Sequence, residues 1–355
     1  MKKQNLDIQF FKFFYSCIIV LYHLAAWTKI TCKGGYYGVE YFLLTAGLFL
    51  FLSFQRGEER GKNQTPGQYL WKRFVRFLPW STTAFILTVV VERVFVNPVE
   101  SVRTWANLFP SDIFEILMVK WNGMNNNAHL LNGPAWTLSA MLIVGFVIWT
   151  LLYHYKKLFL TLIMPVTLIA GFGYWMHLPS ANTEAWIGFT TFGSFRTWLV
   201  MCLSFYCIPM SKKLSEIPLN RLGKCMLTLA EVLIHVFSVF VIFHWAERYY
   251  QWLLTLLFMV SIAIALSGHS YLDKLFRNSK LISLLGEVSM SIYLVHTAVI
   301  RGFDYVFGIS EWSYKELLPL FAVLFVAAVV HYYGTKWMVQ ILSKIWGKAK
   351  KLFIQ

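Results

Sequence analysis

Lys12 and His23 are ionisable residues within the first apolar stretch of the chain, eleven residues apart. Eleven steps of 100° make three turns plus about 20°, so both side chains fall on one stripe of a helix, about 16 Å apart along its axis. In a membrane-spanning helix this stripe predicts an anion-binding cation at Lys12 and a proton-accepting imidazole at His23. The alternatives are a Lys12 that snorkels to the interface and a His23 that forms an interhelical hydrogen bond.

Glu40 stands near the outer end of the second apolar stretch, a short connection after His23. A carboxylate in that place can orient the imidazole and raise its basicity. We therefore expect Glu40 to assist His23 in catalysis. The alternative is a carboxylate at the membrane interface, in contact with water.

Arg73 and Arg76 precede the third apolar stretch and, three residues apart, share one helix face. Guanidinium groups at the level of the cytoplasmic headgroups bind phosphates through paired N–H donors. The two arginines therefore predict binding of anionic lipid or of the phosphates of a nucleotide-bearing donor, in which case Lys12 shares the task.

Ser289, Tyr293 and His296 follow one another at steps of four and three residues, late in the chain. They form one polar stripe on a helix, which predicts the lining of a cavity. Arg196 is a further cation inside an apolar stretch and has no neutral form at physiological pH. We expect these four residues to contribute to substrate binding.

His235 and His331 also lie in apolar stretches, where we expect structural hydrogen bonds. No metal site is predicted, because the histidines fall on different helices and no carboxylate accompanies them at ligand spacing. The five cysteines are odd in number and scattered, so we expect no disulfide framework.

The amino-acid composition indicates the class of protein to which these residues belong. Of 355 residues, 57% are hydrophobic and only 14% are charged, which excludes an ordinary soluble protein and a disordered chain. The formal charge of +15 comes from short basic clusters between apolar runs. Such clusters are typical of loops that face anionic headgroups and do not predict a nucleic-acid interface.

Apolar stretches of about 20 residues, each long enough to cross a bilayer, recur along the chain. They predict an all-α, polytopic membrane bundle of about ten helices in one domain, residues 1–355, with a retained first helix and no cleaved signal peptide. The expected spans are 8–29, 36–55, 77–96, 136–155, 158–177, 187–209, 225–245, 249–268, 282–302 and 316–339.

Lys and Arg residues alternate unevenly along this path. With the N-terminus inside, 22 fall on inner segments and 6 on outer ones. This asymmetry predicts that both termini lie in the cytoplasm and that the protein resides in the cell membrane.

Residues 97–135 form the longest outer segment. Apolar residues at steps of four from Trp105 to Trp121 predict an amphipathic helix, and an Asn-rich turn follows. This helix is expected to rest on the membrane; the alternative is a lid over an outer acceptor site.

Together these motifs resemble the acyltransferase family 3 membrane proteins, which O-acylate cell-surface and secreted polysaccharides. The resemblance covers essentially the whole chain. The matching elements are the basic residue and histidine of the first helix (Lys12, His23), the second-helix segment 38–42 with Gly47, Arg73-x-x-Arg76 with Pro79, the segment 136–139 that begins with Trp136, and the late segment 286–296 with Ser289, Tyr293 and His296.

Two positions depart from the family pattern. Lys12 stands where arginine is common, which keeps the charge but loses the bidentate fork. Met141 stands where relatives often carry glutamate, so this chain acts on its acceptor without that carboxylate, uses Glu40 instead, or has lost the chemistry.

The resemblance implies transfer of an acyl group, foremost acetyl, from cytoplasmic acyl-coenzyme A to a hydroxyl of an extracytoplasmic glycan or lipid-linked sugar. In this interpretation acyl-coenzyme A is a co-substrate, membrane lipids surround the protein, and no metal takes part. Trp136 and Arg196 are expected to bind substrate. Two alternatives remain: a transporter of a glycan precursor, in which the buried charges form a path, and a noncatalytic relative.

Overall fold

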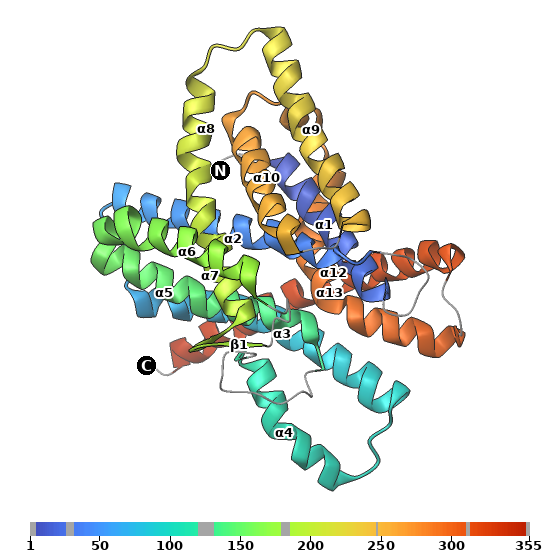
Figure 1. Ribbon diagram of the computed structural model, residues 1–355. Helices are drawn as coiled ribbons and strands as arrows, with labels where there is room; N and C mark the ends of the chain where they lie inside the picture. The colour runs from blue at the N-terminus through green and yellow to red at the C-terminus, as the bar shows by residue number, and fades with distance from the viewer. Residues whose placement is uncertain are drawn as a thin grey trace.

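The computed structural model describes residues 5–25, 32–119, 131–178, 185–245, 248–309 and 313–352, and in these ranges the chain is almost entirely helical (Figure 1). The α-helices are α1 (Leu6–Ala25), α2 (Gly38–Glu59), α3 (Pro66–Val90), α4 (Val102–Ile116), α5 (Trp136–Leu158), α6 (Met164–His177), α7 (Phe192–Leu203), α8 (Cys207–Glu216), α9 (Arg221–His244), α10 (Arg248–Ser267), α11 (Tyr271–Phe276), α12 (Lys280–Phe307) and α13 (Tyr314–Leu352). Short 3-10 turns η1 (Gly35–Tyr37), η3 (Gly133–Ala135) and η5 (Ser204–Tyr206), π-helical turns η2 (Val91–Val96) and η4 (Phe159–Ile163), and a two-stranded hairpin of β1 (Trp186–Ile187) and β2 (Thr190–Thr191) join them.

Eight helical runs in the described part of the chain are long and apolar enough to cross a membrane. They correspond to nine of the ten predicted spans, with ends that differ by up to several residues, because one run, Gly133–His177, holds two of them. The prediction of an all-helical polytopic membrane bundle is confirmed. The runs are Leu6–Ala25, Gly35–Glu59, Pro66–Val96, Gly133–His177, Arg221–His244, Tyr250–Ser267, Lys280–Phe307 and Tyr314–Lys344.

The 45-residue run Gly133–His177 is not one straight rod. Its backbone leaves the helical region at Tyr155, with φ −134° and ψ 35°, and η4 follows. Because such a break lets the chain change direction, α5 and α6 both pack on α7 (Figure 1). The sequence correctly separates two spans here, at 136–155 and 158–177.

The predicted span 187–209 differs from the structure. The segment begins in the strand pair, continues as the 12-residue helix α7, and passes through η5 into α8. At the break, the Ser204 hydroxyl donates a hydrogen bond to the Met201 carbonyl, 2.6 Å away. Pro209 follows within the first turn of α8, where it has no N–H to continue the preceding helix. Hydropathy alone does not detect this break.

Two glycines allow the helices around the site to approach closely. A Cβ on Gly47 of α2 would lie 2.4 Å from the Met201 carbonyl oxygen of α7. A Cβ on Gly286 of α12 would lie 2.4 Å from the Cβ of Gln9 on α1. Gly47 is thus a helix-packing residue.

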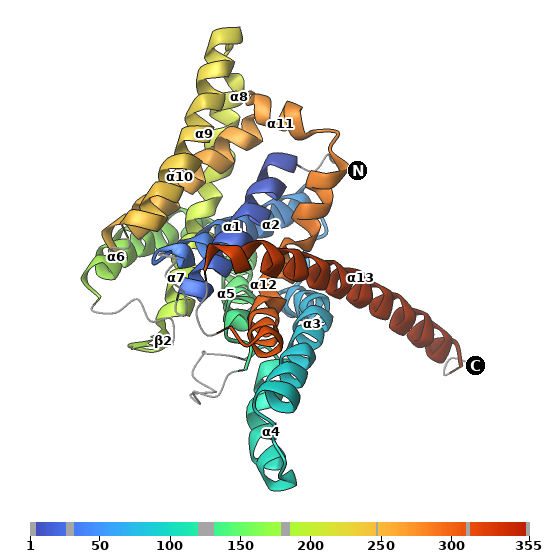
Figure 2. The same cartoon turned by 90° about the vertical axis from the view of Figure 1, so that its right-hand side faces the viewer.

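The outer segment contains the predicted helix as α4, beside α3 at the lower end of the bundle in both views (Figures 1 and 2). Its polar residues face the protein: Asp112 accepts two hydrogen bonds from the buried Arg93, at 2.6 and 2.7 Å. Phe109, by contrast, is 61% exposed. An outward apolar face fits a helix that rests on the membrane. Trp121 and the Asn-rich turn lie outside the described residues.

His235 and His331 have the structural roles predicted for them. The ring nitrogens of His235 lie 2.8 Å from the Tyr15 hydroxyl and 2.7 Å from that of Ser261. Those of His331 lie 2.9 Å from the hydroxyls of Thr83 and Ser291. Each histidine therefore joins three helices through satisfied buried hydrogen bonds.

Candidate active site

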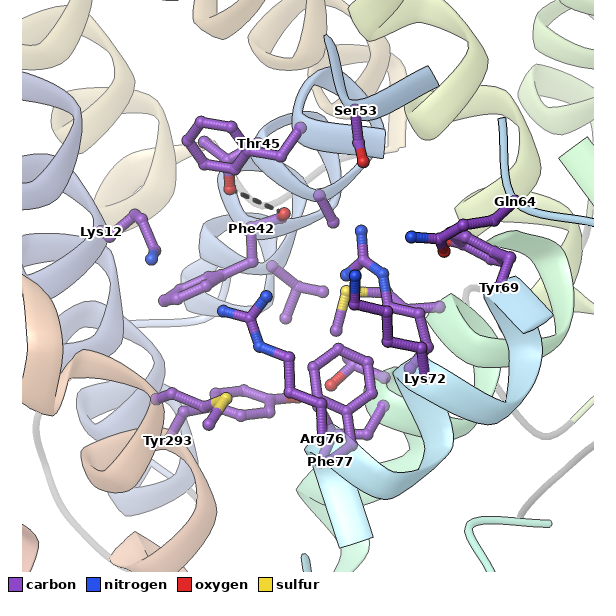
Figure 3. A pocket seen from close by; sticks show the side chains of 18 of the residues that line it. Lys12, Phe42, Thr45, Ser53, Gln64, Tyr69, Lys72, Arg76, Phe77 and Tyr293 are labelled. Carbon is purple, nitrogen blue, oxygen red and sulfur yellow. Dashed lines mark hydrogen bonds between the residues drawn. The ribbon is translucent and has the colours of Figure 1, made fainter. Parts of the chain in front are cut away.

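A cavity of about 440 Å³ lies among α1, α2, α3, α5 and α12 (Figure 3). These helices bring together residues from distant parts of the sequence. Five of the lining residues are cations and none is a carboxylate. The cations are Lys12, Arg56, Lys72, Arg73 and Arg76.

One face of α2 forms a long wall of this cavity. Phe42, Thr45, Phe49, Ser53 and Arg56 all line it, and they follow one another at steps of three and four residues. This spacing keeps them on one stripe of the helix. From Phe42 to Arg56 the stripe rises by about 21 Å, so the cavity is elongated along α2.

The predicted phosphate-binding residues meet in this cavity. Lys12 and Arg76 approach it from opposite sides in Figure 3. The Arg73 guanidinium lies over the rings of Tyr69 and Phe77, at 5.5 and 5.8 Å from their centroids. No ion pair joins any of the five cations to another residue in the described ranges. The cavity is therefore suited to an extended polyanion.

Tyr293 closes one end of the cavity. Its side chain lines the wall, 5.8 Å from the ring of Phe42 between centroids. Its hydroxyl donates a hydrogen bond to the Pro134 carbonyl at 2.8 Å, which ties α12 to the turn before α5. Its own backbone carbonyl lies 2.8 Å from Nδ1 of His296.

His296 is fully buried next to His23, with 4.9 Å between the two ring centroids. Because the partner of His296 Nδ1 is a carbonyl oxygen, Nδ1 must donate, and the neutral ring keeps its lone pair on Nε2. That Nε2 has no hydrogen-bond partner among the residues that the structure describes. Neither histidine lines the cavity itself: they lie one residue layer beyond Tyr293.

The structure corrects the position expected for Glu40. Its carboxylate pairs with Arg196, with Nε 2.5 Å from Oε1, and it also accepts a hydrogen bond from Gln251 at 2.9 Å. Both charged side chains are almost wholly buried. A buried guanidinium requires such a counter-charge, and the ring beside His23 is that of His296. Glu40 therefore neutralises Arg196 and does not orient His23.

Trp136, Arg196 and Ser289 take different places. The Arg196 guanidinium lies 6.0 Å from the Trp136 ring centroid and 5.7 Å from that of Tyr36, so these groups form one cluster with Glu40. Ser289 belongs to the helix contact instead. Its hydroxyl donates to the Gly286 carbonyl, and its carbonyl accepts from Ser16 of α1. The expectation that Ser289 lines the cavity with Tyr293 is thus wrong.

Sequence reasoning assigned no binding role to Arg56, Lys72 or Gln251. Arg56 continues the cavity face of α2, and Lys72 lies one turn before Arg76 on α3. Helical spacing would have found these two once the cavity faces of the helices were known. Met141, which departs from the family pattern, also lines the cavity.

A bundle of apolar helices around a cationic cavity, with His23 and the buried His296 next to Tyr293, defines a multi-pass membrane protein with a site for an anionic substrate. The family model for the acyltransferase domain of acyltransferase family 3 matches residues 5–333. The chain therefore belongs to this family and is a membrane acyltransferase. No curated protein and no solved structure matches it.

Proposed function

We propose that this protein transfers an acetyl group from cytoplasmic acetyl-coenzyme A to a hydroxyl of an extracytoplasmic glycan or lipid-linked sugar. The observation that carries the proposal is the cavity, lined by five cations and no carboxylate, that ends one residue layer from His23 and the fully buried His296. Phosphates bind at such cations, and the thioester end of the donor points toward the histidines.

Length supports this arrangement. Lys12 and His23 lie about 16 Å apart along α1. The pantetheine arm between the pyrophosphate and the thioester sulfur measures roughly 15 Å when extended, from standard C–C and C–N bond lengths. A donor whose pyrophosphate sits between Lys12 and Arg76 therefore places its thioester at the level of the histidine pair.

The chemistry needs one proton acceptor. An imidazole of the pair His23 and His296 takes the proton of the acceptor hydroxyl, and the oxygen attacks the thioester carbon. The tetrahedral intermediate collapses, the C–S bond breaks, and the imidazolium returns the proton to the departing thiolate. Tyr293, at the end of the cavity, is the candidate donor to the thioester oxygen once its hydroxyl leaves the Pro134 carbonyl.

The acceptor approaches from the other side of the histidines. In the orientation predicted from the Lys and Arg distribution, the cationic cavity faces the cytoplasm and Trp136 begins α5 on the outer side. The cluster of Trp136, Tyr36 and Arg196 would offer an incoming sugar aromatic rings and a neutralised cation.

The test is acyl transfer by the purified protein in nanodiscs with radiolabelled acetyl-coenzyme A, together with the O-acetyl content of the envelope glycans of cells that carry each variant. We expect His23→Ala to abolish transfer while the protein reaches the membrane at normal abundance. Normal O-acetylation in that variant would contradict the proposal. Donor binding without any turnover would identify a noncatalytic relative, and absence of donor binding would favour a transporter.

A further inference from the structure

The five cations of the cavity are spread over a greater length than a pyrophosphate can use. Figure 3 shows Lys12 on one side and Lys72, with Gln64 and Tyr69, on the opposite side. Arg56 lies about 21 Å along α2 from Phe42, which contacts Tyr293 at the closed end. The cavity thus has two groups of cations. Lys12 and Arg76 lie near its middle, and Arg56 and Lys72, here called the rim cations, lie farther from Tyr293.

The rim cations have no competing partner in the described part of the chain. Arg56 and Lys72 are both exposed, and neither forms an ion pair there. A nearby exposed lysine behaves differently: Lys156 Nζ lies 2.6 Å from the Glu58 carboxylate. Cations that line a cavity without a carboxylate are available to an anionic ligand.

We propose that Arg56 and Lys72 bind a phosphomonoester on the ribose of the donor, apart from the pyrophosphate held by Lys12 and Arg76. This inference rests on the proposed function and extends it to the class of donor. Coenzyme A carries such a monoester at its ribose 3′ position, beyond the pyrophosphate as seen from the thioester. A guanidinium fork and a compact ammonium are suited to hold its oxygens together.

The assignment has a consequence for donor choice. Phosphopantetheine attached to a carrier protein offers the same thioester arm but has no ribose and no 3′-phosphate. Such a donor leaves Arg56 and Lys72 without a ligand. The rim therefore selects free acyl-coenzyme A over carrier-bound acyl groups, and it does so far from the reacting atoms.

The experiment compares two ligands that differ in this phosphate alone. Binding of acetyl-coenzyme A and of its 3′-dephospho form is measured by calorimetry on the full-length protein in nanodiscs at fixed salt, because such contacts are salt-dependent. The wild type is expected to bind acetyl-coenzyme A about tenfold more tightly. Because Arg56 and Lys72 share this tenfold effect, Arg56→Gln and Lys72→Gln are each expected to weaken binding of acetyl-coenzyme A about threefold and to leave binding of the dephospho ligand unchanged.

Arg60→Gln is the matched control, because Arg60 is an exposed arginine at the end of the same helix, one turn beyond Arg56, and does not line the cavity. It is expected to bind both ligands like the wild type. Equal affinity of the wild type for the two ligands would overturn the inference. It would also be overturned if Arg56→Gln lowered the affinities for both ligands by the same factor. If the wild type bound neither ligand, the proposed function would fail together with the inference. If it bound both ligands equally well, the inference alone would fail and the proposed function would still hold.

Discussion

His296 packs against His23 with its Nδ1 held by the Tyr293 carbonyl, and its Nε2 is buried without a partner. Tyr293, which lines the cationic cavity, therefore also fixes the tautomer of the neighbouring imidazole. A lone pair kept free in an apolar interior is costly unless something binds it. An acceptor hydroxyl that reaches Nε2 would satisfy that lone pair and place its proton for removal.

Replacing either histidine should therefore abolish chemistry and spare donor binding. We expect His23→Ala and His296→Ala to lower kcat by about a hundredfold or more, because general-base catalysis contributes factors of that size. The Kd for acetyl-coenzyme A should stay unchanged, because neither ring lines the donor cavity. Single-turnover kinetics and calorimetry measure the two quantities separately.

His235→Gln provides the control for these variants. It removes another buried membrane histidine, whose partners are Tyr15 and Ser261. We expect lower thermal stability with kcat per folded molecule preserved. A loss of donor binding in His296→Ala without any loss of kcat would contradict the role given to the histidine pair.

The buried pair of Glu40 and Arg196 should behave as one unit. Removing one partner leaves an uncompensated buried charge, which typically costs about 3–5 kcal/mol. We expect Glu40→Gln and Arg196→Met each to lower Tm strongly. The double variant, Glu40→Gln with Arg196→Met, should unfold at a higher temperature than Arg196→Glu, which buries two carboxylates side by side. Thermal unfolding in detergent, followed by fluorescence-detected size exclusion, measures the series. Additive losses from the two neutral single variants would show that the residues are not coupled.

Gly47 should tolerate no larger residue. Its missing Cβ leaves room for the Met201 backbone, and neither backbone can move without separating α2 from α7. We expect Gly47→Val to destabilise the protein by about 1–3 kcal/mol or more, as overpacking does. Gly67→Ala is the control, because no atom lies within 4 Å of a Cβ built there. Equal Tm values for the two variants would contradict the close contact.

The features that followed from the sequence are those that periodicity or charge encodes directly. The helix face of Lys12 and the spacing of Arg73 and Arg76 follow from helix geometry alone. The structure brings these three residues to one cavity. Membrane spans can be predicted because the lipid bilayer requires long apolar helices. The position of Glu40 was predicted wrongly because its partner, Arg196, is 156 residues away in sequence. No local pattern shows which of several buried groups meet across helices.

Breaks in the helices were harder to predict for a related reason. The change of direction at Tyr155 and the interruption at Ser204 occur inside apolar runs, where hydropathy stays high. The first depends on the backbone geometry of Tyr155, and the second on the hydrogen bond from Ser204 to the Met201 carbonyl and on Pro209. Those signals are weak beside twenty apolar residues.

Cys32 should be chemically inert at neutral pH. Its side chain is completely buried in the segment before η1, and burial raises the pKa of its thiol to about 12. The thiolate is the reactive form, so alkylation by iodoacetamide should stay negligible from pH 7 to pH 9 and begin only when higher pH or unfolding exposes the group. Cys225, which is exposed, provides the internal comparison by mass spectrometry. Equal labelling of both cysteines in folded protein would contradict this burial.

Lys12 should act through charge at the middle of the donor cavity. In the described part of the chain its side chain forms one long hydrogen bond, to Gln9 at 3.5 Å, so its ammonium is available to a phosphate. We expect Lys12→Gln to raise the KM for acetyl-coenzyme A about tenfold or more, with a smaller effect on kcat, because the lost contact is present before and during the chemical step. Lys12→Arg should keep the KM within a few-fold of the wild type, since charge is preserved and a second donor is added. A kcat defect with unchanged KM in Lys12→Gln would place the residue at the reacting atoms instead. Raising the salt concentration should weaken donor binding less in Lys12→Gln than in the wild type, because one fewer charged contact is screened.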